Sequence, residues 1–97
     1  MTMFARIVKV TWLGDHRLLL EFNDGLIRDV EIHRGLRGVF GVLDDEDVFS
    51  QVSVDASIGT VVWPGNLDLD PDVLYGASES GSCSVYTLIS ESPLQTL

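Results

Sequence analysis

Hydrophobic and polar residues alternate in the first third of the chain, with the period of two that β-strands show when one face is buried. The residues Phe4, Val8, Val10 and Trp12 fall on one face of an extended segment, and Ile7, Lys9 and Thr11 fall on the other. This pattern predicts a strand over residues 5–13.

Two turn signals then mark the ends of further strands. Gly14-Asp15-His16 has turn chemistry, and the apolar alternation that follows it predicts a strand over residues 17–22. Asn23-Asp24-Gly25 is a strong hairpin signal, because glycine supplies the positive φ that a tight turn requires. Alternation resumes beyond it and predicts a strand over residues 26–32.

A second hairpin is predicted later in the chain. Residues 51–55 and 58–63 are rich in valine, a β-branched strand former, and Ala56-Ser57 joins them. With the earlier strands this makes an antiparallel sheet of about five strands, built from two hairpins.

The acidic run Asp44-Asp45-Glu46-Asp47 lies between the hairpins and is typical of a helix start. With Asp44 as the N-cap, the other three acids occupy the first turn, where the free N–H groups and the positive end of the helix dipole favour negative charge. Leu43 and Val48 then have the spacing of a hydrophobic staple. The glycines at 35, 38 and 41 predict that the segment before the run is a loop or a bent turn.

The segment from Asp68 to Glu79 has two interpretations. Its acids fall at positions 1, 3, 5 and 12 of a calcium loop, but position 6, which requires glycine, is Val73, and Pro71 lies inside the loop. The helix interpretation takes Asp70 as the N-cap, Pro71 as the first helical residue and Gly76 as the stop, with Leu69 and Leu74 spaced as a staple. Weak calcium binding by Asp68, Asp70 and Asp72 stays open. Together these patterns predict one α+β domain with one or two short helices.

Residues 77–97 shift to a serine-rich composition, which marks a boundary near Gly76. Within this tail, residues 85–89 either form a strand that adds to a sheet edge, of this chain or of a neighbour, or belong to a frayed terminus. The first interpretation is consistent with a homodimer.

Charge is distributed unevenly. All six basic residues lie in residues 1–37 with five acids, whereas residues 38–97 hold ten acids and no base, which gives a net charge of −9. Direct nucleic-acid binding is therefore not expected, because it depends on cations that displace phosphate counterions. The acidic half either serves solubility alone or attracts a small basic protein.

The sequence contains few candidate catalytic residues. Asp29, Glu31 and His33 share one strand face and are the best acid–base candidates, while His16 lies in a predicted turn. Trp12 and Trp63 fit core or rim positions better than stacking platforms. Cys83, the single cysteine, can form neither an internal disulfide nor a cysteine cluster, and no nearby base activates it. We expect no cofactor, no metal and no enzymatic activity.

The opening stretch MTMFARIVKV carries charges at Arg6 and Lys9 inside its apolar run. It is too short and too broken for a signal peptide or a membrane span. We therefore expect a cytoplasmic protein that does not enter the membrane, and the single cysteine fits a reducing compartment.

A resemblance to a known family is carried by the residues that follow the fifth strand. Trp63-Pro64-Gly65-Asn66, with Asp68-Leu69, Pro71 and Leu74-Tyr75 after it, resembles the closing motif of the DUF2442 family of small bacterial domains. The hairpin over residues 17–32 and the segment from Phe49 to Val54 resemble earlier parts of that family, so the likeness covers about residues 5–76.

The resemblance implies an α+β domain of unknown function, joined in some relatives to a helix-turn-helix domain. Such domains often lie beside small partner proteins in their genomes, which suggests an antitoxin-like or binding role. We therefore expect a non-catalytic module that binds a basic protein through its acidic second half, with Asp44, Asp45, Glu46 and Asp47 as the candidate contacts. The alternatives are a regulator that acts on DNA with a partner and a metal-dependent enzyme.

Overall fold

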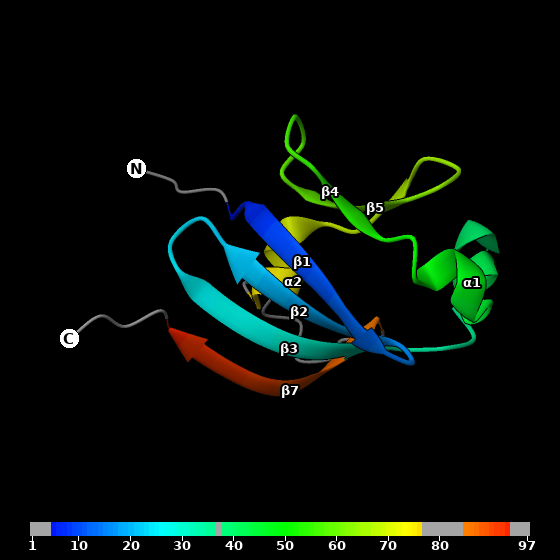
Figure 1. Ribbon diagram of the computed structural model, residues 1–97, viewed down its shortest axis with the longest axis horizontal. Coiled ribbons are helices and arrows are strands. Elements are labelled where there is room, and N and C mark those ends of the chain that lie inside the picture. The colour runs from blue at the N-terminus through cyan, green and yellow to red at the C-terminus, as the bar shows by residue number, and fades with distance from the viewer. Residues whose placement is uncertain (1–4, 37, 77–84, 94–97) are drawn as a thin grey trace.

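The computed structural model describes residues 5–36, 38–76 and 85–93. These residues form two antiparallel sheets (Figure 1). The first sheet has the order β1-β2-β3-β7, with the strands β1 (Ile7–Gly14), β2 (Arg17–Phe22), β3 (Leu26–Ile32) and β7 (Tyr86–Pro93). The second has the order β4-β5-β6, with the strands β4 (Ser53–Asp55), β5 (Thr60–Trp63) and β6 (Leu67–Asp68). The α+β class is confirmed, but the single sheet of about five strands is wrong.

The β2–β3 hairpin has the bounds that the sequence predicts. Its turn uses Gly25 at a φ of 94°, and the Asp24 carboxylate accepts a hydrogen bond of 2.9 Å from the Leu26 N–H. Leu18 pairs with Val30 across the two strands, and both side chains are fully buried. The turn therefore fixes the register that places the apolar face of both strands in the core.

Strand β1 does not keep the predicted alternation. Ile7 pairs with Phe22 and Lys9 pairs with Glu21, so Val8 is the extra residue of a β-bulge. The bulge shifts the alternation by one residue: Ile7 is buried, whereas the Val8 side chain is 59% exposed. The prediction is therefore wrong for Ile7 and Val8, whereas Val10 pairs with the buried Leu20 and packs against the core. Trp12 lies at the rim and is 39% exposed, and Phe4 lies outside the described residues.

In the second sheet, β4 and β5 are both shorter than the strands predicted over residues 51–55 and 58–63. Residues 56–59 form the turn between β4 and β5, so Ile58 belongs to the turn rather than to a strand. Strand β6 is new relative to the sequence prediction, since two residues are too few to show a period. The two sheets meet where the Ile7 N–H donates to the Gly59 carbonyl over 2.8 Å.

The first helix begins one residue later than predicted. A 3₁₀ helix, η1 (Gly38–Asp44), occupies the segment where we expected a loop or bent turn and leads into α1 (Glu46–Phe49). Asp44 is therefore already in a helical turn, and Asp45 is the N-cap, with extended backbone and a side chain that accepts from the Asp47 N–H. The Asp44 carboxylate accepts from the Gly35 N–H instead, over 3.0 Å.

The second helix, α2 (Pro71–Tyr75), forms as predicted. Asp70 is its N-cap and accepts a hydrogen bond of 2.9 Å from the Asp72 N–H, and Pro71 opens the first turn. Gly76 ends the helix in the left-handed conformation, at a φ of 90°. Leu69 and Leu74 are both buried, which anchors the helix start in the core.

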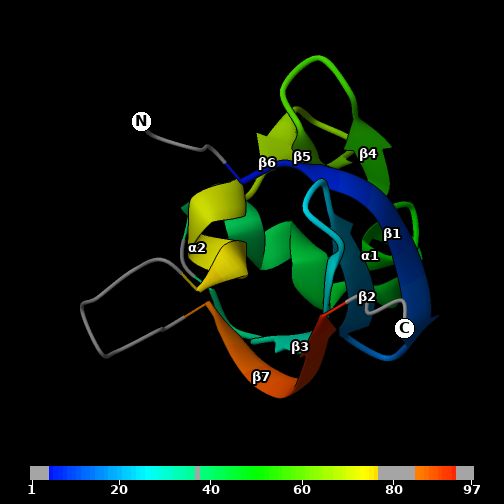
Figure 2. The same ribbon diagram turned by 90° about the vertical axis from the view of Figure 1, so that its left-hand side faces the viewer.

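The core lies between the two sheets and the helices. Seen end-on in Figure 2, the four-stranded sheet curves along one side, the β4-β5-β6 sheet lies above it, and α2 lies beside them. All of these elements contribute buried apolar side chains: Ile7, Leu18, Leu20, Phe22, Val30, Ile32, Leu43, Phe49, Val61, Trp63, Leu67, Leu69, Leu74 and Tyr86. No helix in the described ranges is both long enough and apolar enough to cross a bilayer.

Strand β7 comes from the serine-rich segment. It contains residues 86–89 of the strand expected over 85–89, continues to Pro93 and pairs antiparallel with β3 of its own chain. Ile32 pairs with Tyr86 and Leu26 with Pro93, with a bulge between them. Strand β7 is therefore one outer edge of the first sheet.

Candidate functional site

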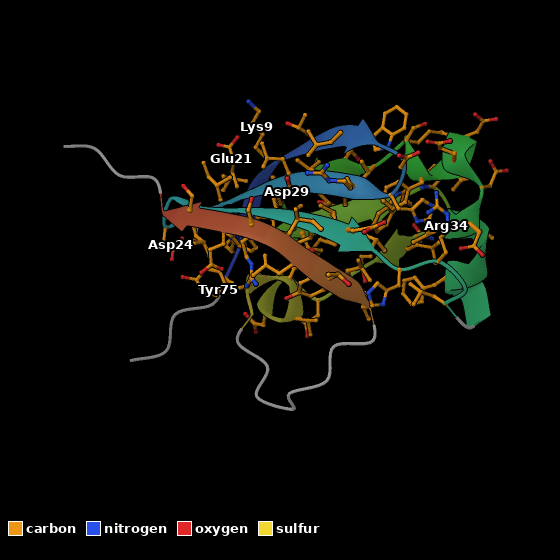
Figure 3. The ribbon with its side chains drawn as sticks, turned by 90° about the horizontal axis from the view of Figure 1, so that it is seen from below. Lys9, Glu21, Asp24, Asp29, Arg34 and Tyr75 are labelled. Atoms are coloured by element: carbon orange, nitrogen blue, oxygen red, sulfur yellow. The ribbon has the colours of Figure 1, made fainter. Side chains whose placement is uncertain are left out.

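One end of the first sheet carries a cluster of polar side chains that holds α2 in place. The Tyr75 hydroxyl, at the end of α2, donates a hydrogen bond to the carboxylate of Asp24 in the β2–β3 turn. The Tyr75 ring also packs edge-on against Phe22, with the ring centroids 5.0 Å apart. Figure 3 shows Asp24 and Tyr75 together at this end. The hairpin and the closing motif, both part of the family resemblance, therefore meet at this contact.

This hydrogen bond shifts the pKa values of both Asp24 and Tyr75. It lowers the pKa of Asp24, with a further contribution from the Leu26 N–H, because both donors favour the ionised carboxylate. The same bond raises the pKa of Tyr75, because the neighbouring Asp24 disfavours loss of the phenolic proton. The pair is thus held as carboxylate and neutral phenol across the range around neutrality.

Tyr75→Phe should raise the pKa of Asp24 toward that of an ordinary carboxyl group. A depressed folded pKa gives stability that is fully present above the unfolded value, about pH 4, and is lost as the pH falls through the folded value. In the variant the folded pKa lies closer to the unfolded value, so this pH-dependent loss of stability should be smaller and should be complete at a higher pH. An NMR titration of the aspartate side chains measures the shift.

Asp55 is the matched control for this titration. Its pKa is also lowered, but by hydrogen bonds from Ser57, far from Tyr75 in sequence. The variant should leave the Asp55 titration unchanged. An Asp24 titration that is the same with and without the Tyr75 hydroxyl would contradict the assigned cause.

Arg28 is a buried cation beside this corner. It is 6% exposed, on the core face of β3, and its Nε lies 3.3 Å from a carboxylate oxygen of Glu91 on β7. The contact is an ion pair without an aligned hydrogen bond at Nε. The guanidinium carbon lies 5.9 Å from the centre of the Tyr86 ring, within reach of a cation–π interaction. Arg28 therefore joins β3 to β7.

The residues of the closing motif mainly build the fold. The Trp63 indole N–H donates to the Phe49 carbonyl over 3.0 Å, which ties β5 to α1. Leu69 and Leu74 are in the core, and Pro71 opens α2. The remaining two residues, Pro64 and Asp68, are exposed.

The acidic run forms a separate surface at the opposite end of the molecule. Asp44, Asp45, Glu46 and Asp47 are all exposed, at the junction of η1 and α1. Figure 3 places Arg34 at this end as well. Within the described ranges, no ion pair involves any of the four carboxylates. The run therefore remains a concentration of negative charge.

The basic side chains are used mostly within the first sheet. Three pairs join its neighbouring strands: Lys9 with Glu21, Arg17 with Asp29, and Arg28 with Glu91. The Arg6 side chain donates to the Ala56 carbonyl over 2.5 Å. Lys9, Arg17 and Arg28 are thus used within the first sheet, whereas Arg34 lies at the end that carries the acidic run.

The acid–base candidates do not come together. Asp29 binds Arg17 and raises the pKa of that guanidinium through their hydrogen bond. The His33 imidazole instead contacts the Thr87 hydroxyl on β7, with Nε2 and Oγ1 2.6 Å apart. Glu31 pairs with Arg17 across the β2–β3 register. The shared strand face therefore carries cross-strand contacts.

His16 is in the predicted turn but is fully buried, which the turn alone did not indicate. Its Nδ1 lies 3.2 Å from the Ile32 carbonyl and donates to it in the matching tautomer. Its ring stacks on Phe49, with centroids 4.3 Å apart and planes 3° apart. Its Nε2 is buried and has no hydrogen-bond partner among the described residues. The ring acts as an aromatic core residue.

The three aspartates considered for calcium have separate contacts. Asp70 caps α2, Asp72 accepts from the Ala5 N–H over 3.2 Å, and Asp68 lies in β6. The described part of the chain contains no group of three metal-ligating side chains close enough to hold an ion. Glu79 and Cys83 lie outside the described residues.

Sequence reasoning missed the Arg28–Glu91 pair and the burial of His16. A signal for Arg28 existed, since it occupies a core position in the same alternation as Val30 and Ile32. Its partner could not be named, because the pairing of β7 with β3 is a property of the fold.

Comparison with known proteins gives one family. The model of a family described as "Protein of unknown function (DUF2442)" matches residues 7–80. No curated protein and no solved structure matches the chain. The matched range includes both halves of the Asp24–Tyr75 contact and ends before β7.

Proposed function

The chain belongs to the DUF2442 family of proteins of unknown function, and on that premise we propose that it is a non-catalytic module that binds a basic protein. The residues that resemble the family are used mainly for the fold, so they do not themselves define a binding surface. The acidic run at η1 and α1, Asp44 to Asp47, is the surface that supports the proposal best. An antitoxin-like role is one form that such binding would take.

The observation that supports the proposal is the exposure of all four carboxylates, none of which forms an ion pair among the described residues. A helix cap requires one acceptor, and Asp45 supplies it. Glu46 and Asp47 add favourable charge at the helix start, but this effect is only about 0.3–1 kcal/mol for each group at an exposed site. Four adjacent carboxylates exceed what a helix of four residues needs. An exposed concentration of one sign attracts a partner of the other sign.

A basic segment of a partner fits this surface by chemistry. Lysine or arginine side chains would contact the carboxylates directly, and long-range attraction would raise the association rate. Exposed charge pairs are screened by salt, with a Debye length of about 8 Å at physiological ionic strength. Binding of this kind therefore weakens as the salt concentration rises.

Replacing Asp44, Asp45 and Asp47 with asparagine should weaken the complex about 3-fold to 150-fold, because each lost charge pair removes about 0.2–1 kcal/mol. The fold should survive, since asparagine caps a helix as well as aspartate does. The measurement begins with copurification from the host at low and high salt. The purified partner is then titrated against both chains by calorimetry.

The matched control removes the same charge elsewhere, with Asp15→Asn, Glu31→Gln and Asp68→Asn. These residues lie outside the run, and both triple variants change the net charge from −9 to −6. The control should bind nearly as well as the natural chain. Equal weakening in the two triple variants would show that binding depends on the net charge of the chain. It would contradict the proposal that the acidic run is the binding surface.

A further inference from the structure

The outer edge of β7 is a second candidate surface. In the described ranges, β7 is the last strand of its sheet, and no strand pairs with its other side. Figure 1 shows it along the lower side of the molecule, with no other element below it. Leu88 and Ile89 on this strand are 41% and 46% exposed, although both are large and apolar. An edge of this kind is a template for pairing with another strand.

The sequence of β7 contains little that would prevent such pairing. Lysine and proline are common devices for blocking an edge, but β7 has no lysine or arginine, and its proline is the last residue, Pro93. Its single charge, Glu91, already pairs with Arg28 of its own chain. The bulge at Ile89 is the one protective feature that the strand contains.

We infer that β7 is a self-association surface, on which β7 of one copy pairs antiparallel with β7 of a second copy across a two-fold axis between Leu88 and Ile89. This register places Leu88 opposite Ile89, Thr87 opposite Ser90 and Tyr86 opposite Glu91 of the other copy. Apolar side chains therefore meet at the centre, and no like charges are directly opposite, which cross-strand pairing would penalise. The arrangement is isologous and closed.

The charge distribution fits a second copy in this orientation. Tyr86 pairs with Ile32, so β7 starts near the end of the molecule that carries η1 and α1. Antiparallel pairing turns the second copy around, and the two acidic runs then lie at opposite ends of the dimer. Their repulsion is screened, because the separation is longer than the Debye length of about 8 Å. This inference is independent of the proposed binding of a basic protein.

Sedimentation equilibrium of the full chain tests the inference. We expect a monomer–dimer equilibrium with a dissociation constant of about 1–500 µM, as a small interface gives. Ile89→Lys should raise this constant at least tenfold, because it places two charges beside the two-fold axis. Amide hydrogen exchange in β7 should slow as the protein concentration rises. A chain that stays monomeric to about 1 mM would overturn the inference.

Ile58→Lys is the matched control. Ile58 is also 46% exposed but lies in the β4–β5 turn, and both variants change the net charge from −9 to −8. The control should dimerise like the natural chain, and equal loss in both variants would contradict the β7 interface. Circular dichroism checks the fold, and Leu88→Lys replaces Ile89→Lys if that variant unfolds.

Salt distinguishes this inference from the proposed function. Each copy carries a net charge of −9, so added salt reduces repulsion and should strengthen the dimer. The complex with a basic protein should respond in the opposite direction. If the dimer prediction fails, the proposed binding of a basic protein is unaffected, and the reverse also holds.

Discussion

Phe49→Ala should lower the free energy of unfolding by about 3–5 kcal/mol, a loss typical of a large aromatic residue removed from a core. Phe49 is fully buried at the end of α1. Its ring stacks on His16 and lies 5.6 Å from the centre of Trp63. The substitution therefore removes the ring that lies between the β1–β2 turn and β5.

The loss of stability is increased because the cavity would uncover the buried His16 ring. One ring nitrogen of His16 has no hydrogen-bond partner in the part of the chain that the structure describes, and Phe49 covers one face of that ring. Small domains are stable by only about 5–15 kcal/mol, so a loss of this size should leave part of the population unfolded. Urea denaturation followed by tryptophan fluorescence measures the change.

Phe40→Ala is the control for this prediction. Phe40 is in η1 and packs against the same core, but it is only partly buried. Its truncation should cost about 1–2 kcal/mol, in proportion to the smaller area removed from water. Equal losses in the two variants would show that Phe49 is not a central contact.

Gly76→Ala should destabilise the protein by about 2–4 kcal/mol, for two separable reasons. The first is the backbone, because a φ of 90° is strained for any residue with a Cβ atom. The second is space, because a Cβ at this position would overlap with Nη1 of Arg28. The guanidinium would have to move, although Glu91 and the Tyr86 ring hold it in a buried site.

Gly65→Ala separates the two reasons. Gly65 has nearly the same φ, 92°, but a Cβ there would meet nothing within 4 Å. It should therefore cost only the backbone strain, about 1–2 kcal/mol. The difference between the two variants measures the constraint that α2 places on Arg28. If thermal unfolding gives the same loss for both, the Arg28 site is looser than its contacts indicate.

Local signals predicted the parts of the fold that depend on a few neighbouring residues. The turn at Asn23-Asp24-Gly25 fixed the bounds of β2 and β3, and the Asp70 cap with Gly76 fixed those of α2. Each of these rests on hydrogen bonds or φ values within one turn, which residue type alone can indicate. The family was also predicted from such short motifs, and the match over residues 7–80 confirms it.

The failures occurred where distant segments decide the outcome. The bulge at Val8 depends on pairing with β2, and the shift of the N-cap from Asp44 to Asp45 depends on η1 continuing into α1. The division into two sheets depends on strand pairings between distant segments, such as β3 with β7. Among the candidate contacts, the exposure of the acidic run was foreseeable from its charge. The Arg28–Glu91 pair could not be predicted from the sequence, because it depends on the pairing of β7 with β3.

The position of β7 also determines the order in which the protein can be assembled during synthesis. Strand β3 pairs with β7, yet the whole second sheet and both helices are translated between them. At about 5–20 residues per second, the edge of β3 waits several seconds for its partner. During that interval the core side of Arg28 lacks Glu91 and Tyr86. The nascent chain therefore exposes a strand edge and a cation that the finished protein covers.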